Sequence, residues 1–161
     1  TAETPFNPRA VSLIATSVDE LLMNAIYDAP EEAPGASAAI SRSAPIELQG
    51  KRAVDFRMGF DGDYASFTVM DRFGTINKGK LLTHLMRMYV NKEYQVNDAV
   101  MGAGLGLAAT FRTGGSLLFV TEPGVRSEVT VFFKQTSSFK EFRKQFRFVS
   151  IHLVPESKLP R

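Results

Sequence analysis

Two pairs of β-prone runs, each pair separated by a turn signal, constrain most strongly what this chain can fold into. The first pair flanks Phe60-Asp61-Gly62-Asp63 and the second flanks Pro123-Gly124; the runs are residues 53–60, 64–70, 116–121 and 128–133. An Asp-Gly between such runs is a strong β-hairpin signal. We therefore expect two antiparallel hairpins.

Helical periodicity precedes and separates these hairpins. From Pro8 onward, apolar residues recur at steps of three and four: Val11, Ile14, Val18, Leu21, Leu22, Ala25 and Ile26. This spacing indicates an amphipathic helix, which Pro30 and Pro34 should end. Residues 30–45 are rich in Pro, Ala, Ser and Glu and predict a flexible loop. We expect further helices over 80–90 and up to residue 112, and a last strand over 146–152.

This order of elements predicts an α+β fold, a two-layer α/β sandwich with helices on one face of a mainly antiparallel mixed sheet. At 161 residues the chain has the length of one domain. We therefore treat 1–161 as a single domain, with a core over 8–135 and a C-terminal extension over 136–161. The chain begins with a threonine, and we expect it to be a fragment of a longer protein.

Composition narrows the function classes. The net charge of +2 demands neither a nucleic acid nor an acidic membrane as partner. The absence of cysteine excludes disulfides, thiolate zinc sites and a cysteine nucleophile, and it fits a cytoplasmic location. No uninterrupted apolar run approaches the roughly 20 residues of a membrane span. The phenylalanine-rich basic tail over 139–147 could stack on bases, but rings packed on the sheet are the favoured interpretation.

Three segments occur in an order that carries the functional argument: DELLMNAIYDA at 19–29, VMDRFGTI at 69–76 and GAGLGL at 102–107. Together they resemble the N, G1 and G2 boxes of the GHKL superfamily, which comprises the gyrase, chaperone, histidine-kinase and mismatch-repair ATPases. The resemblance implies the Bergerat, or histidine-kinase-like, ATPase fold over most of the chain. It also implies ATP and Mg²⁺ as cofactors.

The first segment places Glu20 and Asn24 four residues apart, and so on one face of a helix. A carboxamide oxygen is a hard ligand of the kind that Mg²⁺ takes. The resemblance implies that Asn24 holds the metal, that Glu20 is the catalytic base and that Asp28 belongs to the cofactor site. The alternative is that these are ordinary polar residues on the solvated side of the helix.

The second segment puts Asp71 just past a predicted strand, followed by Gly74. The resemblance implies that Asp71 accepts a hydrogen bond from the exocyclic amine of adenine. The alternative is a capping aspartate that starts a turn. Phe73 and Thr75 stand where the family usually has glycines, so we expect Phe73 to fill part of the nucleotide pocket.

The third segment supplies glycines that let a loop pass close to phosphates ahead of a helix. The expected phosphate-binding residues are Gly102, Gly104, Leu105, Gly106 and Leu107. Thr130, on the second hairpin, is expected near the phosphates because the family often has a hydroxyl there. The resemblance also implies a mobile ATP lid over 77–101.

These features favour an ATP-binding bacterial signalling domain. Glu20 indicates a regulatory protein kinase of the anti-sigma-factor serine/threonine type, nearest among the branches. Its partner would be an antagonist or sigma-factor-like protein, as substrate or ligand, and a homodimer is compatible with this function. One alternative is a degenerate interaction module that keeps the fold without catalysis. Another is the ATP-binding half of a histidine kinase, which would require a phosphoacceptor helix elsewhere.

Overall fold

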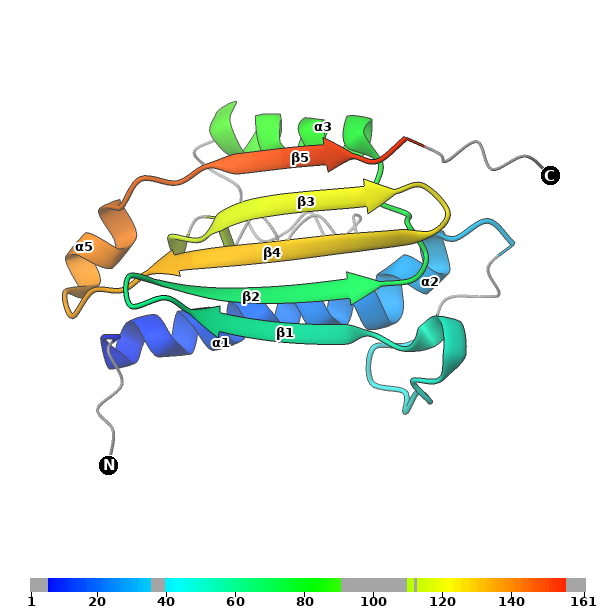
Figure 1. Cartoon of the computed structure of the whole chain (residues 1–161), viewed down its shortest axis with the longest axis horizontal. Coiled ribbons are helices and arrows are strands. Elements are labelled where there is room, and N and C mark those ends of the chain that lie inside the picture. Colours follow the sequence, from blue (N-terminus) through cyan, green and yellow to red (C-terminus); the bar gives the residue numbers. More distant parts are fainter. Residues whose placement is uncertain (1–5, 36–39, 91–109, 112, 156–161) are drawn as a thin grey trace.

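Five strands form one mixed sheet in the computed structural model, which describes residues 6–35, 40–90, 110–111 and 113–155. The strands are β1 (Asp55–Phe60), β2 (Tyr64–Asp71), β3 (Ser116–Glu122), β4 (Arg126–Lys134) and β5 (Val149–Leu153). They lie in the order β1-β2-β4-β3-β5 (Figure 1). Only the β3–β5 pair is parallel. Both predicted hairpins are confirmed, and so is a mainly antiparallel sheet.

The helices are α1 (Pro8–Met23), α2 (Ala29–Glu32), α3 (Lys78–Val90) and α5 (Phe139–Lys144), with a short 3-10 turn at Gly50–Arg52. In Figure 1, α1, α2 and α3 lie behind the sheet, and none of the described helices covers the face toward the viewer. The domain is therefore an α+β fold of two layers, as the order of elements predicted. The predicted last strand is confirmed as β5, preceded by the short helix α5.

The long N-terminal helix begins where the sequence indicated but runs further than expected. The side chain of Asn7 caps it by accepting a hydrogen bond from the Arg9 amide, and Pro8 occupies its first turn. Between α1 and α2 lies one π-helical turn, Asn24–Asp28, whose wider register is closed by an Ala29 amide to Asn24 carbonyl bond. Pro30 lies in the first turn of α2, where a proline is tolerated.

The prediction that Pro30 ends this helix was therefore wrong. The helical stretch continues to Glu32 and gives way to extended backbone at Ala33, just before Pro34. A proline disfavours helical backbone in the residue before it, so the expected role of Pro34 is confirmed. The stretch Pro8–Glu32 is long and apolar enough to cross a membrane by length and composition alone, which is weak evidence because core helices and signal sequences pass the same test.

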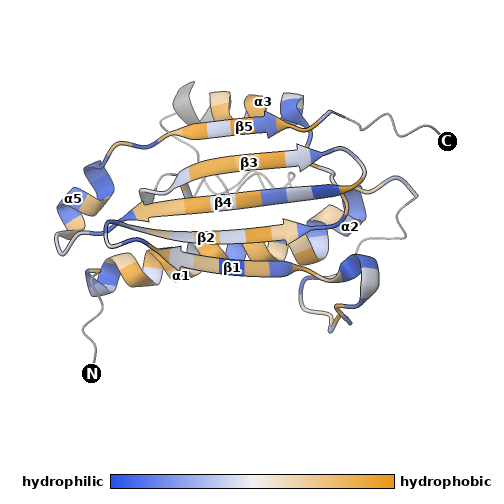
Figure 2. Ribbon diagram, viewed as in Figure 1, coloured by the Kyte–Doolittle hydropathy of each residue, from blue (hydrophilic) through white to orange (hydrophobic). Residues whose placement is uncertain are grey.

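The core lies between the helices and the inner face of the sheet. Helical side chains such as Ala10, Ile14 and Leu21 pack against alternate residues of the strands, and the central members are Val69, Leu117, Phe119, Val131 and Phe133. Figure 2 shows apolar residues along the strands and apolar and polar residues interspersed along α1. One cluster holds both layers together.

The C-terminal segment belongs to this core and is not an appendage. The Phe142 side chain is fully buried, and its ring stacks on those of Phe133 and Phe139 at centroid distances of 5.8 and 6.4 Å. Ring packing is thus confirmed for this part of the tail, although Phe146 is 87% exposed. The hydrophobic core therefore extends past residue 135, the limit that the sequence suggested.

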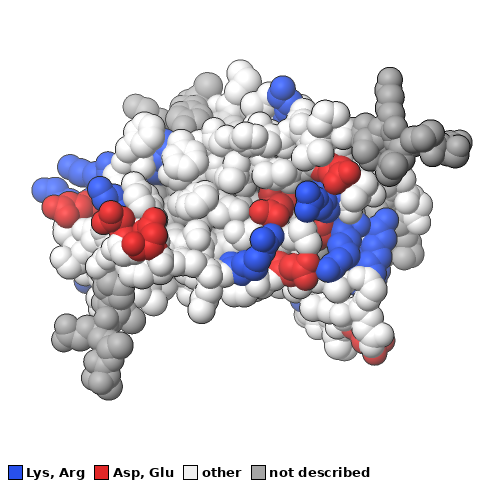
Figure 3. Space-filling view, in the orientation of Figure 1, with Lys and Arg blue, Asp and Glu red and all other residues white. Residues whose placement is uncertain are grey.

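The outer face of the sheet carries a mixture of hydroxyl and apolar side chains. Thr68 and Thr130 share a hydrogen bond of 2.9 Å there, and the rings of Phe132 and Phe148 lie 6.0 Å apart. Figure 3 shows that charged side chains gather toward both ends of this face and are sparse in its middle.

Candidate functional site

One wall of the candidate site is built around Asp71, the last residue of β2. Its side chain is 6% exposed. Its Oδ1 accepts hydrogen bonds from the amides of Phe73 at 2.8 Å and Gly74 at 3.2 Å. Burial raises the pKa of Asp71 above its usual value of 3.8, while hydrogen bonds from Phe73, Gly74 and Ser127 oppose that rise. The carboxylate is thus fixed by backbone groups in a poorly solvated position.

Gly74 is required by close backbone packing. Its φ is +63°, a conformation that favours glycine. A Cβ there would lie 2.2 Å from the Glu122 carbonyl oxygen and 2.7 Å from the Gly124 nitrogen. The Gly124 amide also donates to the Gly74 carbonyl at 3.2 Å. This glycine therefore fixes the turn after Asp71 against the β3–β4 hairpin.

A row of buried polar side chains crosses the inner face of the sheet at this end. Asp71 pairs with Ser127 on β4, which in turn pairs with Thr121 on β3. Ser127 is 1% exposed and Thr121 is fully buried. Within the described part of the chain, the Thr121 hydroxyl has no hydrogen-bond partner. A buried hydroxyl without a partner is costly, so the Thr121 hydroxyl is a position where an ordered water would complete the hydrogen bonding.

The opposite wall comes from the helical stretch that carries Asn24 and Asp28, and Glu20 lies four residues before Asn24 on the same stretch. All three reach the guanidinium of Arg42. Its Nη2 lies 2.6 Å from Asp28 Oδ2 and donates to Asn24 Oδ1 at 3.4 Å. Its Nη1 lies 3.8 Å from Glu20 Oε2. Three oxygens from successive turns therefore face one cationic group.

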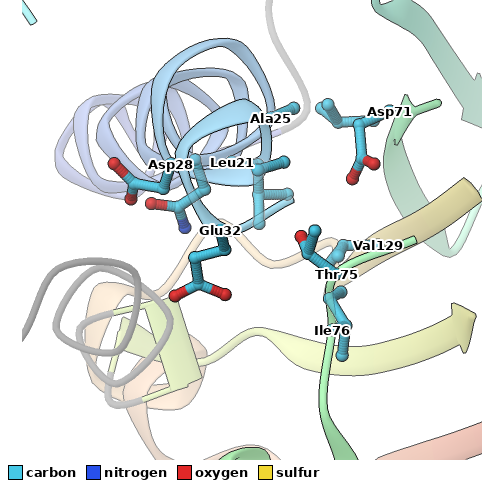
Figure 4. Close-up of a pocket in the computed structure, with 11 residues that line it drawn as sticks. Leu21, Ala25, Asp28, Glu32, Asp71, Thr75, Ile76 and Val129 are labelled. Atoms are coloured by element: carbon cyan, nitrogen blue, oxygen red, sulfur yellow. The ribbon is translucent and has the colours of Figure 1, made fainter. Parts of the chain in front are cut away.

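Between the two walls lies a cavity of about 70 Å³ (Figure 4). We call its helical side the helix wall and its strand side the strand wall. The helix wall consists of Leu21, Asn24, Ala25, Asp28, Ala29 and Glu32; the strand wall consists of Val69, Asp71, Thr75, Ile76 and Val129. In Figure 4 the Asp71 carboxylate points into the space between the walls, whereas that of Asp28 points away from Asp71.

The structure thus brings together Asn24, Asp28 and Asp71, three of the predicted site residues. Glu20 does not line the cavity, and its carboxylate lies 3.8 Å from Arg42, which also contacts Asn24 and Asp28. Gly74 supports the strand wall from behind. The alternative that Asp71 caps a turn is correct for its Oδ1, which accepts hydrogen bonds from the Phe73 and Gly74 amides. The residue also lines the cavity, so it can have a second role there.

Two expectations need correction. Phe73 does not fill this cavity; it lines a separate one of about 190 Å³ with Tyr27, Pro30 and others, and Lys51 Nζ lies 5.2 Å from its ring centroid. Thr130 follows Val129 in β4, and successive strand side chains point to opposite faces. Its hydroxyl therefore meets that of Thr68 on the outer face, away from the cavity.

The third motif cannot be placed. Gly102, Gly104, Leu105, Gly106 and Leu107 lie outside the described residues, as do positions 91–101 of the expected lid. The start of that lid segment is helical, as α3. The expected phosphate-binding loop accordingly stays a prediction.

Two residues at the site escaped sequence reasoning. Glu32 continues the four-residue series of Glu20, Asn24 and Asp28, a visible signal that was missed because Pro30 was expected to end the helix. Arg42 is the single charged residue within the Ser- and Ala-rich stretch 33–45, and its distance in sequence from the helix gave no sign of contact.

The two walls offer different chemistry. Among the described residues there is no group of three or more His, Cys, Asp or Glu side chains that could hold a metal ion alone. Mg²⁺ usually keeps several waters and needs only one or two protein oxygens beside substrate phosphates. Asn24 and Asp28 of the helix wall already direct side-chain oxygens at the Arg42 guanidinium. The same oxygens fit a hydrated Mg²⁺ ion. The strand wall offers hydrogen-bond partners in a dry setting, which suits a polar heterocycle.

The chain matches no protein-family model and no curated protein sequence. The case for a function therefore depends on the geometry of the two walls.

Proposed function

We propose that this chain is an ATP-binding signalling domain of the GHKL type, a cytoplasmic regulatory kinase that transfers the γ-phosphate to a serine or threonine of a partner protein. One observation carries the proposal. Asn24 and Asp71, which belong to two separate motifs of the sequence, line the same cavity from opposite walls. Unrelated polar residues on a solvated helix and in a turn would have no reason to meet.

In this proposal Asp71 reads adenine by accepting a hydrogen bond from its exocyclic amine. Guanine presents a carbonyl at that position and would be rejected. The buried hydroxyls of Ser127 and Thr121 continue the polar row behind Asp71 without lining the cavity, and Ser127 Oγ accepts a hydrogen bond from the Ile76 amide. The cavity of about 70 Å³ is well below the roughly 300–1,000 Å³ of pockets that enclose small molecules, so only the base end of ATP would lie in it.

The helix wall would serve the phosphates. Asn24 would hold Mg²⁺, which neutralises charge on the phosphates during transfer, and Asp28 would orient its water shell. Glu20 would accept the proton of the attacking hydroxyl. Phosphoryl transfer depends mostly on positioning and charge stabilisation, so residues in these roles would account for the activity.

The deciding experiment is a calorimetric titration of the chain with ATP, with GTP as the competitor base and with Mg²⁺ present or absent. We expect saturable, adenine-specific binding that weakens without Mg²⁺. Asn24→Ala should remove the Mg²⁺ dependence. No binding at millimolar ATP by folded protein would overturn the proposal.

A separate measurement tests the catalytic base. Glu20→Gln should leave ATP affinity unchanged and reduce ATP turnover by about 100-fold, the lower end of general-base contributions. Glu31→Gln, on the same helical stretch but lining the other cavity, is the matched control and should turn over ATP like the wild type. Equal turnover in the Glu20 variant would remove Glu20 from this role.

One observation favours a second candidate, an interaction module that binds no nucleotide. The oxygens of Glu20, Asn24 and Asp28 already have a protein partner in Arg42. A module that no longer binds ATP would benefit from such internal neutralisation. The same titration separates the two candidates, because the module predicts no heat with ATP in either metal condition.

A further inference from the structure

The segment that carries Arg42 lies against the helix through two independent contacts. The Tyr27 hydroxyl donates to the Ala44 carbonyl at 3.0 Å, and the Ala44 amide closes a turn onto the Ser41 carbonyl at 2.8 Å. The second contact is the ion pair of Arg42 with Asp28 at 2.6 Å. We call residues 40–44 the strap.

The charge contact is the more easily displaced of the two. The Arg42 side chain is 40% exposed, and that of Glu20 is 33% exposed. Ion pairs open to water are weak, because solvent and salt screen them and two long side chains must be held in place. A competing cation could therefore take the oxygens without unfolding the domain.

A guanidinium and a hydrated divalent ion cannot both occupy the position that these oxygens share. Arg42 contacts one oxygen each of Glu20, Asn24 and Asp28. The Asp28 side chain is 14% exposed, so it has little room for a second partner. If Arg42 were removed and no cation replaced it, the carboxylates of Glu20 and Asp28 would lie about one helical turn on either side of the Asn24 carboxamide without a positive partner from Arg42.

We propose that Arg42 is an internal counter-ion that competes with the divalent cation for the oxygens of Glu20, Asn24 and Asp28. Metal binding then releases the strap from the helix, and loss of metal restores it. The inference depends on the proposed function, because it takes the helix wall as the metal side. It goes further because it assigns control of metal binding to Arg42, a residue outside the three motifs.

The test uses Mn²⁺ alone as the probe, with no nucleotide, and follows free Mn²⁺ by electron paramagnetic resonance. Arg42→Gln should bind Mn²⁺ about fivefold more tightly than the wild type, the equivalent of one exposed ion pair. Arg42→Lys should fall between the two, because an ammonium cannot span three oxygens as a planar guanidinium does.

Lys51→Gln is the matched control for net charge. Lys51 lies near the same helical stretch but lines the other cavity and contacts Phe73. It should leave Mn²⁺ affinity within about twofold of wild type, since charges apart in solvent are screened. If Arg42→Gln gains no more affinity than Lys51→Gln, the competition does not exist.

Amide hydrogen exchange gives a readout of the strap itself. Mg²⁺ should speed exchange over residues 41–46 in the wild type, and Arg42→Gln should exchange fast in that segment without metal. Exchange that Mg²⁺ leaves unchanged in a chain that binds the metal would overturn release of the strap. The Mn²⁺ titration and the hydrogen-exchange measurement contain no ATP. A negative result in either one therefore contradicts the role of Arg42, whereas a negative ATP titration contradicts the proposed function.

Discussion

The strand wall of the cavity is fixed by backbone geometry, whereas the helix wall is arranged by ion pairs that reach solvent. Asp71 is 6% exposed and held by two amides of its own turn. Asn24 and Asp28 are held by Arg42, whose side chain is 40% exposed. The comparison teaches that one wall is preorganised to recognise a group, while the other can exchange its partner. The following predictions test that difference, from the largest effect to the smallest.

Gly74→Ala should have the largest effect, because the strand wall has no space for a Cβ at that turn. A strained positive φ and a backbone clash at 2.2 Å together should lower the free energy of unfolding by about 3 kcal/mol or more. Urea denaturation measures this. Gly124→Ala is the matched control, since its φ is +73° with nothing within 4 Å, and it should lose only about 1 kcal/mol. Equal losses would mean that the turn is not tightly packed.

Asp71→Asn should weaken ATP binding about tenfold or more, because a hydrogen bond to a charged acceptor is lost from a dry site. The variant should stay folded, since an amide oxygen can still accept from the Phe73 and Gly74 amides. Calorimetry measures the affinity, and Asp55→Asn on the exposed strand β1 is the control. Unchanged affinity in Asp71→Asn would show that the strand wall does not read the base.

Phe73→Leu should cost about 1 kcal/mol of stability and leave ATP affinity unchanged. The ring is buried at 8% exposure but faces the cavity of Tyr27 and Lys51, not that of Asp71. Apolar swaps that roughly conserve side-chain volume usually cost less than about 1.5 kcal/mol. Stronger ATP binding by the variant would mean that Phe73 does obstruct the nucleotide, against its position here.

Acidification should stabilise the wild type relative to Asp71→Asn. The pKa of Asp71 is raised in the folded state, so the folded protein binds a proton more readily than the unfolded chain. The buried charge of Asp71 lowers the free energy of unfolding when the pH is above the folded-state pKa. This loss of stability disappears as the pH falls toward 3.8. Urea denaturation of both proteins at pH 7 and pH 4 measures the difference. If the free energy of unfolding of the wild type fell relative to that of Asp71→Asn on going from pH 7 to pH 4, a raised pKa of Asp71 would be contradicted.

Arg42→Gln should have the smallest effect on folding, below about 1 kcal/mol, because exposed ion pairs contribute little. Thermal or urea denaturation in low salt measures it. A loss of several kcal/mol would instead make the helix wall as rigid as the strand wall, and the contrast between them would disappear.

The sequence predicted the architecture well because periodicity and turn chemistry are local. Asp61-Gly62 and Pro123-Gly124 define two hairpins, and the apolar spacing after Pro8 defines a helix. Pro30 misled because a π-helical turn precedes it and places it in the first turn of a further helical segment, where a proline is tolerated. The mainly antiparallel sheet followed from the hairpins, but the parallel β3–β5 pair could not be read from them.

The candidate site was predictable only in part. Asn24, Asp28 and Asp71 line one cavity, and their roles in binding a nucleotide stay predictions. The direction of side chains was harder to predict from the sequence. Phe73 lines the other cavity because of the turn after β2, and Thr130 faces the outer side of the sheet because of the register of β4. Arg42 reaches the helix across a loop, and loop contacts carry no periodic signal. The glycine motif over 102–107 stays a prediction.

The sheet order has a consequence for how the protein is made. β3 has β4 on one side and β5 on the other, and β5 follows the other four described strands in the chain. Until residues through Leu153 have left the ribosome, β3 offers an edge that lacks its partner β5. Folding should therefore be completed only after nearly the whole domain is synthesised, so a nascent chain stalled before β5 would be the form most exposed to chaperones and to aggregation.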